Sequence, residues 1–331
     1  MRKKILVTGA SGFVGSHLVE SAAAAGHEVH AAVRKSSNIS SIKPYVHQVV
    51  YPDFEDMDEL RNLFETQKYD YIIHAAALTK AKSEKEINAV NVCITQRLLE
   101  AAFQSTVPPQ RFVFVSSLAA IGPIAYNGGE LTDDAPYKPV TLYGRSKQAA
   151  EEMIKSKFPT QPITVIRPTA VYGPREKDLF ILFDTMNKGL DAYIGRASQK
   201  LSFVYVKDLV AVLLNACTAP QEGLTFFNIT DGQAYSRYAM ADIFKETFAK
   251  KLLRVHVPFG IVAGVAKISQ WLYRNSAQTP VIYPERLGEL TAQNWSCDIS
   301  RAAYILHYKP KYNLANGLKE SLLWYKQNKW F

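Results

Sequence analysis

The sequence predicts an α/β fold in which a doubly wound parallel sheet carries a smaller, mainly helical lobe. Three observations support this. Strand-like runs alternate with helical patterns through the first half, a glycine-rich turn joins the first strand to the first helix, and this rhythm ends after Pro168. The 331 residues suffice for one large domain or two. We expect a dinucleotide-binding domain over residues 1–170 plus about 201–230, and a substrate-binding lobe over about 171–200 plus 231–331.

The elements follow from hydrophobic periodicity. Strands are predicted at Lys4–Thr8, Glu28–Val33, Val46–Tyr51, Tyr71–Ala75, Arg111–Ser116 and Ile163–Arg167. Helices are predicted at Val14–Ala25, Asp56–Thr66, Glu84–Gln104 and Tyr143–Ser156. After Pro168, the strand Phe203–Val206, the helix Lys207–Cys217 and the strand Thr225–Ile229 suggest a return to the sheet. Ligands of such folds bind at the carboxyl ends of the strands, so the lobe should close over that edge.

Composition limits the functional classes. Hydrophobic residues make up 47% and charged ones 21%, as in ordinary globular proteins. Three widely spaced cysteines form no metal-ligand spacing, so we expect no metal and a reducing, cytoplasmic setting. The net charge of +9 fits a solvated basic surface, or attraction to an anionic cofactor, substrate or membrane. We expect no nucleic-acid partner, since basic blocks with interleaved aromatics are missing.

No apolar run approaches the ~20 residues that span a bilayer, so no transmembrane segment is expected. The most apolar stretch of the last third is Val255–Tyr273. It predicts either a core helix of the lobe or an apolar lid over a lipid-like substrate, with peripheral membrane contact as a further possibility of the lid.

The segment Thr8–Gly15 follows a predicted strand and opens a predicted helix. Gly9 would allow the tight turn, Gly12 the approach of a pyrophosphate, and Gly15 close packing of helix on strand. The positive end of the helix favours an anion. This context predicts dinucleotide binding in a Rossmann domain.

The end of the second strand bears on the choice of cofactor. An NAD site commonly has an acidic residue there, whereas this chain has Arg34 and Lys35. A guanidinium suits the 2′-phosphate of NADP, so NADP is favoured and NAD stays possible. The alternative is a pair of solvated cations. Asp53 would bind the adenine amino group, or else cap the helix that starts near Asp56.

Tyr143 and Lys147 share one face of a predicted helix. A nearby ammonium would lower the pKa of the tyrosine from about 10 and prepare it for proton transfer. Ser116 and Ser117 end a strand at the ligand edge, where a hydroxyl can donate to a substrate carbonyl. A serine pair that satisfies backbone groups is the alternative.

Together these segments resemble the extended short-chain dehydrogenases/reductases, also called the NAD-dependent epimerase/dehydratase family. The matching stretches are Thr8–Gly15, His74–Ala77, Asn91-Val92, Ser116-Ser117, Tyr143–Lys147, Arg167-Pro168, Val171–Pro174 and Tyr205–Asp208. The resemblance implies that Ser117, Tyr143 and Lys147 are catalytic and that the protein is a homodimer through helices near 84–104 and 143–156. It also implies cofactor contacts by Thr8, Ser11, Phe13, Val14, Ala75, Ala76, Ala77, Asn91, Ser116, Pro168 and Val171, besides the glycines.

Departures from the family's patterns narrow the reaction. Leu118 and Ala119 replace the acidic pair of related sugar dehydratases, and Leu201-Ser202-Phe203 replaces the run whose arginine holds a nucleotide-sugar diphosphate in related epimerases. Ile121-Gly122 and Arg34 are more similar to the dihydroflavonol reductase and 3β-hydroxysteroid dehydrogenase branches. We therefore expect reduction of a ketone, or oxidation of a secondary alcohol, on an apolar substrate. The alternatives are a nucleotide-sugar 4-epimerase with bound NAD and a non-catalytic dinucleotide sensor or scaffold.

Overall fold

The computed structural model describes residues 2–220, 222–274, 276 and 283–331. Its centre is a seven-stranded sheet with the order β11-β6-β5-β4-β1-β2-β3. Every neighbouring pair of strands in this sheet is parallel. The strands are β1 (Lys4–Thr8), β2 (Glu28–Ala32), β3 (Gln48–Val50), β4 (Tyr71–His74), β5 (Arg111–Val115), β6 (Ile163–Pro168) and β11 (Thr225–Ile229). This confirms the doubly wound α/β fold.

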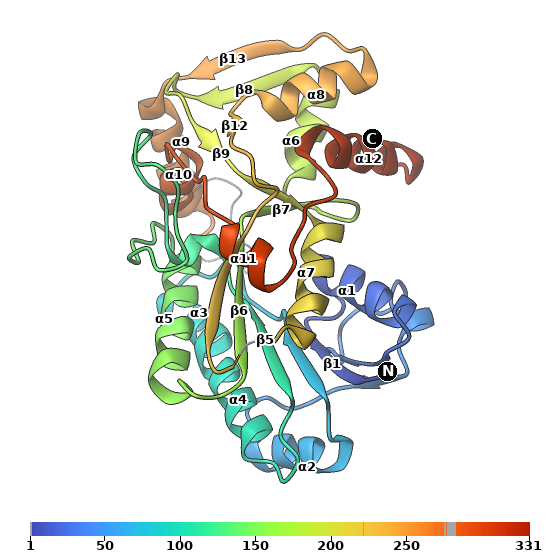
Figure 1. Cartoon of the computed structure of the whole chain (residues 1–331). Helices are drawn as coiled ribbons and strands as arrows, with labels where there is room; N and C mark the ends of the chain where they lie inside the picture. The colour runs from blue at the N-terminus through green and yellow to red at the C-terminus, as the bar shows by residue number, and fades with distance from the viewer. Residues whose placement is uncertain (1, 221, 275, 277–282) are drawn as a thin grey trace.

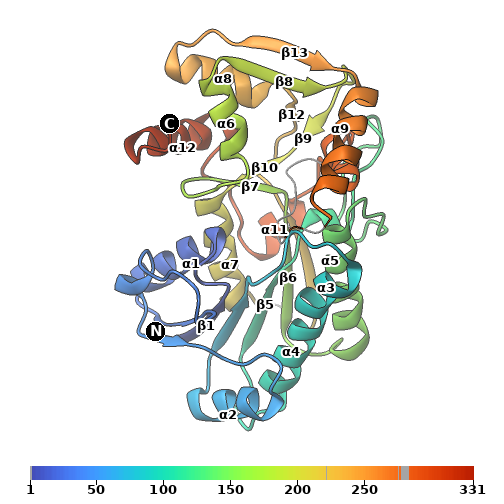
Figure 2. The ribbon, with the colours of Figure 1, turned by 180° about the vertical axis from the view of Figure 1, so that it is seen from behind.

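Helices cover both faces of the sheet because successive strand residues point to opposite sides (Figures 1 and 2). On β1, Ile5 and Val7 join a core with α1 (Phe13–Ala24) and α7 (Val206–Thr218), whereas Leu6 joins a second core with α2 (Met57–Gln67), α4 (Thr95–Phe103) and α5 (Leu142–Lys157). Short 3₁₀ turns lie at η1 (Lys43–Tyr45) and η3 (Leu118–Ala120).

One predicted helix is interrupted. The segment expected as a single helix over Glu84–Gln104 consists of α3 (Glu84–Asn88), the π-helical η2 (Ala89–Ile94) and α4. A π segment adds a residue to the turn and rotates the following side chains. In this position it directs Asn91 inward, where its side chain is buried.

The remaining elements form the lobe in the upper part of Figure 1. Its helices are α6 (Phe180–Asn187), α8 (Ala239–Phe248), α9 (Phe259–Leu272), α10 (Pro284–Leu290) and α12 (Leu314–Gln327), while α11 (Ser300–Ile305) packs near β11. Its strands form three pairs: β7 (Ala170–Tyr172) with β10 (Phe203–Tyr205), β8 (Leu190–Ile194) with β13 (Leu253–Val257), and β9 (Lys200–Leu201) with β12 (Tyr235–Ser236).

One prediction for this part of the chain was wrong. The strand expected at Phe203–Val206 does not rejoin the main sheet, because β10 pairs with β7 and Val206 already begins α7. Of the two interpretations left open for Val255–Tyr273, the structure does not support a helix buried in the core of the lobe. Its first residues belong to β13, and in α9 the buried side chains among those described are Val262 and Ala266. Among the described residues, no helix is both long and apolar enough to cross a bilayer.

Candidate active site

The glycine loop lies between β1 and α1 with no room for side chains. Gly9 has a φ of +67°, and a Cβ added there would lie 2.7 Å from the backbone nitrogen of Ala76. A Cβ on Gly15 would lie 2.1 Å from the carbonyl oxygen of Gly9. Gly12 precedes the first turn of α1, and no side chain caps the free N–H groups of that turn. The loop and helix end therefore form a cradle that fits the pyrophosphate of a dinucleotide.

The residues next to this cradle, at the end of β1 and after β4, form a second wall of the cradle. The Thr8 hydroxyl accepts a hydrogen bond of 3.2 Å from the Ala76 backbone, which joins the ends of β1 and β4. Ser11, Phe13 and Val14 lie partly buried on the loop and first turn, and Ala75–Ala77 follow β4.

Asn91 supports this wall from behind. Its amide exchanges two 2.8 Å hydrogen bonds with the backbone of Leu78 and donates a third, also 2.8 Å, to the hydroxyl of Ser146. The π segment thus ties the loop after β4 to α5. The structure thus shows Asn91 positioning this loop, a role that helical periodicity alone does not reveal.

The residues expected to select the cofactor lie at the same edge of the sheet. Arg34 and Lys35 are exposed just beyond β2, which lies between β1 and β3. Asp53 follows β3, and its carboxylate accepts a hydrogen bond of 2.8 Å from the backbone of Glu55. It does not cap α2, because the N-cap is Asp56.

The predicted catalytic residues meet at the ends of β5 and α5. Ser117 lies beside the half-buried Tyr143, and a hydrogen bond from the side chain of Ser117 lowers the pKa of the tyrosine. The close approach depends on Gly144, since a Cβ there would lie 2.3 Å from the carbonyl oxygen of Ala119. Thr141 starts the helix by accepting a hydrogen bond of 3.0 Å from the backbone N–H of Gly144.

Lys147 lies one turn further along α5. Its ammonium donates a 2.9 Å hydrogen bond to the carbonyl oxygen of Val115 and lies 5.9 Å from the centre of the Tyr143 ring. Burial lowers the pKa of Lys147 to about 7, against a smaller rise caused by Glu151.

The residues around Tyr143 do not by themselves produce the expected fall in its pKa. Burial raises the pKa of Tyr143 to about 12, and the hydrogen bond with Ser117 only partly opposes this. The carboxylate of Glu289 raises it further. Desolvation of the phenolate thus dominates the pKa of Tyr143 and favours the protonated phenol.

The hydroxyl of Ser116 is buried against α5. It donates to the buried carboxylate of Glu151, which also accepts a 2.6 Å ion-pair contact from Arg167. Tyr137 donates to the same carboxylate at 2.6 Å. The expected contact of Ser116 with the cofactor stays a prediction, and it would have to coexist with the hydrogen bond between the Ser116 hydroxyl and Glu151. Glu151 was missed, although its position four residues after Lys147 placed it on the same helical face.

A second missed group fixes the loop after β7. His17 of α1 contacts the carbonyl oxygen of Pro174 at 2.9 Å and the guanidinium of Arg175 at 2.7 Å. Arg175 also pairs with Glu20 at 3.1 Å and has a positive φ of 73°. Burial lowers the pKa of His17 to about 4. These contacts connect the loop after β7 with α1, the helix that follows the glycine loop.

A cavity of about 350 Å³ lies between the catalytic residues and the lobe. Ser117 and Tyr143 lie on its wall with Pro168, while Val171 is half-buried in β7 nearby. Most of the other lining residues are apolar: Leu118, Ala119, Ala170, Leu179, Leu182, Met186, Leu201, Phe203, Met240, Leu290 and Trp295.

Three charged residues also line the cavity: Arg237, Arg286 and Glu289. The two terminal nitrogens of Arg237 donate to the carbonyl oxygens of Ala197 and Ile194, at 2.7 and 2.8 Å. Burial raises the pKa of Glu289, while Arg286 lowers it by a smaller amount. None of the three was singled out from the sequence, since no short motif contains them.

Comparison with known proteins agrees with this architecture. Residues 5–230 match the family described as the NAD dependent epimerase/dehydratase family. The chain is 26% identical over 332 residues to a ceramide reductase of Caulobacter vibrioides, covering 99% of this chain and 96% of that protein. It is also 26% identical over 338 residues to a UDP-glucose 4-epimerase of Vibrio cholerae, covering 97% of this chain and 95% of the relative.

Solved structures show the same fold. A UDP-glucose 4-epimerase of Thermotoga maritima, crystallised with UDP-glucose, superposes with a TM-score of 0.79 at 21% identity, over 98% of this chain and 99% of that one. The relatives include reductases, dehydrogenases, epimerases and dehydratases. The protein is therefore an enzyme of the NAD dependent epimerase/dehydratase family, within the extended short-chain dehydrogenases/reductases.

Proposed function

We propose that the protein reduces a ketone, or oxidises the matching secondary alcohol, within an apolar substrate and with NADP(H). The observation that carries this proposal is the cavity of about 350 Å³, in which Ser117 and Tyr143 share a mostly apolar wall. Transfer of a substrate with one carbonyl oxygen into such a cavity leaves a single polar atom to satisfy, and two hydroxyls can do so.

In the reducing direction, the nicotinamide supplies a hydride when bound. Ser117 donates a hydrogen bond to the substrate oxygen and stabilises its developing charge. Tyr143 gives its phenolic proton to that oxygen. The high pKa of Tyr143 suits this role, because the proton stays on the phenol until an alkoxide forms beside it.

Lys147 would compensate the negative charge that remains on Tyr143 after the proton has moved to the substrate. Its pKa of about 7 leaves a large fraction protonated near neutrality. The resulting ammonium, one helical turn from Tyr143, would stabilise the phenolate left by the reaction. The carboxylate of Glu151 raises the pKa of Lys147 and so favours its protonated form.

We propose that residues 1–170 and about 201–230 bind the dinucleotide. Gly9, Gly12 and Gly15 would hold the pyrophosphate at the start of α1, and Pro168 and Val171 would lie against the nicotinamide. Arg34 and Lys35 would bind the 2′-phosphate of NADP, which their exposure beyond β2 supports. The lobe, over about 171–200 and 231–331, would select the substrate.

The homodimer through α3, α4 and α5 stays a prediction, as does a cytoplasmic location. The exposed free thiol of Cys93 is compatible with a reducing compartment.

A nucleotide-sugar 4-epimerase is the second candidate, because Arg237 and Arg286 line the cavity and could meet a diphosphate. The use of both terminal nitrogens of Arg237 by backbone carbonyls argues against it. Arg196 and Lys200, the other cations near this region, do not line the cavity. Lys200 instead lies 4.8 Å from the centre of the Tyr126 ring.

One experiment separates the two candidates. The purified protein is mixed with NADPH or NADH and with a series of long-chain ketones, and in parallel with UDP-glucose. Loss of nicotinamide absorbance with the ketones, faster with NADPH, supports the reductase. Interconversion of UDP-glucose and UDP-galactose without net loss of cofactor would establish the epimerase instead.

A further inference from the structure

The outer face of α9 is unusually apolar for a surface helix. Side chains of Ile261, Ile268, Trp271 and Leu272 are 59%, 61%, 62% and 62% exposed. Ile261, Val265, Ile268 and Leu272 follow one another at spacings of four, three and four residues, so they form one stripe along the helix. We call these residues and Trp271 the α9 stripe. Figures 1 and 2 place α9 at the outer edge of the lobe.

The distribution of apolar side chains around this helix is the reverse of that expected for a helix that packs on a protein core. Among the described residues, its inner side contributes small side chains, Val262, Ala266 and the partly buried Ala263, which pack with Leu287 of α10. The larger apolar side chains point outward. Contiguous exposed apolar surface of this kind marks an interaction site.

Cations border the α9 stripe. Lys267 is exposed within the helix, and the guanidinium of Arg274 lies 5.7 Å from the centre of the Trp271 ring. Lys82, from the loop before α3, donates a hydrogen bond of 3.2 Å to the carbonyl oxygen of Arg274. From Phe259 to Arg274 the sequence contains no acidic residue. A partner with negative charge beside an apolar layer would complement this surface.

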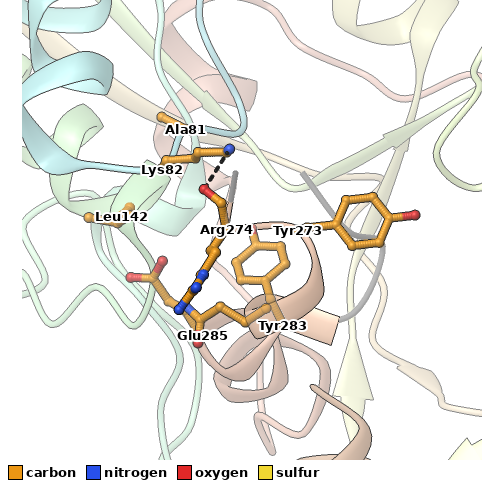
Figure 3. Close-up of a pocket in the computed structure, with 8 residues that line it drawn as sticks. Ala81, Lys82, Leu142, Tyr273, Arg274, Tyr283 and Glu285 are labelled. Carbon is orange, nitrogen blue, oxygen red and sulfur yellow. Dashed lines mark hydrogen bonds between the residues drawn. The ribbon is translucent and has the colours of Figure 1, made fainter. Parts of the chain in front are cut away.

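The end of α9 also borders an opening next to the catalytic helix. A cavity of about 250 Å³ is lined by Lys82, Leu142, Gln270, Tyr273, Arg274 and Glu285, among others. Leu142 directly precedes the catalytic Tyr143. In Figure 3 the ring of Tyr273 points away from Lys82 and Glu285. Glu285 is neutralised by an ion pair of 2.7 Å with Arg145.

We propose that the α9 stripe docks on a lipid bilayer that contains anionic lipids. The apolar side chains would lie at the boundary between headgroups and acyl chains, Trp271 and Tyr273 at the interface, and Lys267, Arg274 and Lys82 against the headgroup phosphates. A second copy of the chain fits less well. A symmetric contact between two such faces would bring their cations together without acids to pair them.

The test uses sedimentation with vesicles and needs no substrate, so it is independent of the proposed reaction. Vesicles of phosphatidylcholine alone are compared with vesicles that contain about one third phosphatidylglycerol. We expect the protein to sediment with the anionic vesicles and to dissociate from them as salt is raised. Ile261→Ser combined with Ile268→Ser should weaken the partition constant roughly tenfold or more.

Matched variants separate the contributions of apolar side chains and of positive charge to vesicle binding. Tyr304→Ser removes an apolar side chain of α11 that is 83% exposed, and it should leave vesicle binding unchanged. Lys267→Gln with Arg274→Gln should abolish the preference for anionic vesicles. NADPH binding and the melting temperature of every variant establish that it is folded.

Two results would overturn the proposal. One is a parent protein that stays in the supernatant with both vesicle types, or whose binding the double serine variant leaves intact. The other is a change of molecular mass in sedimentation velocity on the same double substitution, which would assign the α9 stripe to a contact between two copies of the chain.

Discussion

The ammonium of Lys147 donates its hydrogen bond to the carbonyl oxygen of Val115, the last residue of β5. The lysine is thereby anchored to the strand end that carries Ser117. Because Tyr143 lies on the same helix, one lysine fixes the proposed proton donor relative to the hydroxyl proposed to polarise the substrate. This anchoring underlies the first two predictions.

Tyr143→Phe should reduce turnover by about 10²–10⁴-fold, because it removes the proton donor while keeping the ring. The affinity for NADPH should stay close to that of the parent. Steady-state rates and a fluorescence titration measure the two effects. Tyr304→Phe, on the exposed surface of α11, is the control and should behave as the parent. A Tyr143→Phe enzyme with most of its activity would remove this residue from the mechanism.

The two neighbouring serines should respond differently to substitution. Ser117→Ala should lower kcat while the melting temperature hardly changes. Ser116→Ala leaves the buried carboxylate of Glu151 without one hydrogen bond, which should cost about 1–3 kcal/mol of the free energy of unfolding. Urea denaturation and kinetics on both variants check this. The assignment fails if Ser116→Ala is the variant that loses activity at full stability.

Cofactor preference should depend on Arg34. A charge-assisted hydrogen bond to phosphate is worth about 1.5–3 kcal/mol, so Arg34→Ala should weaken NADPH roughly 10- to 150-fold. NADH, which has no 2′-phosphate, should bind almost as before. Lys157→Ala, at the exposed end of α5, controls for the loss of one positive charge. Equal affinity of the parent protein for both cofactors would contradict this prediction.

Acid should destabilise the fold through His17. Its pKa is about 4 in the folded protein and near 6.5 when unfolded, so below pH 6.5 the unfolded chain binds a proton that the folded one does not. Stability is therefore complete above pH 6.5 and falls as the pH drops toward 4, by about 2 kcal/mol at pH 5. Urea denaturation at pH 7.5 and 5 measures this loss.

His17→Gln keeps a polar side chain and should remove only the share of the pH dependence that His17 causes, because burial also lowers the pKa of His74, to about 3, and that histidine destabilises the fold in acid in the same way. His307→Asn, at an exposed residue with a φ of +49°, should leave it intact. An unchanged pH dependence in the His17→Gln variant would show that other groups cause the acid sensitivity.

Much of the sheet could be read from the sequence because apolar periodicity and glycine turns act locally. The predicted strand Lys4–Thr8 has the same bounds in the structure. Which strands pair with one another could not be predicted in the same way. The pattern of Phe203–Val206 fits a strand but does not specify the strand with which it pairs. In the structure it pairs with β7, outside the main sheet.

The same limit applies to the site. Glycine spacing and the Tyr143–Lys147 pair are short-range features. The contact of Ser116 with Glu151 joins residues 35 positions apart, and that of Glu151 with Arg167 spans 16. Such contacts depend on how β5, β6 and α5 assemble, and single-sequence patterns do not contain that information.

The wall of the large cavity is built from two sources. Ser117 and Tyr143 stand on the sheet domain, whereas Leu182, Met240 and Trp295 come from segments added after the sixth strand. The residues proposed to handle the proton thus come from other elements than these three, although Leu118 and Ala119, next to Ser117, also line the cavity. Over evolution, or in the laboratory, the second set can be exchanged to admit a different molecule while the first keeps the same chemistry.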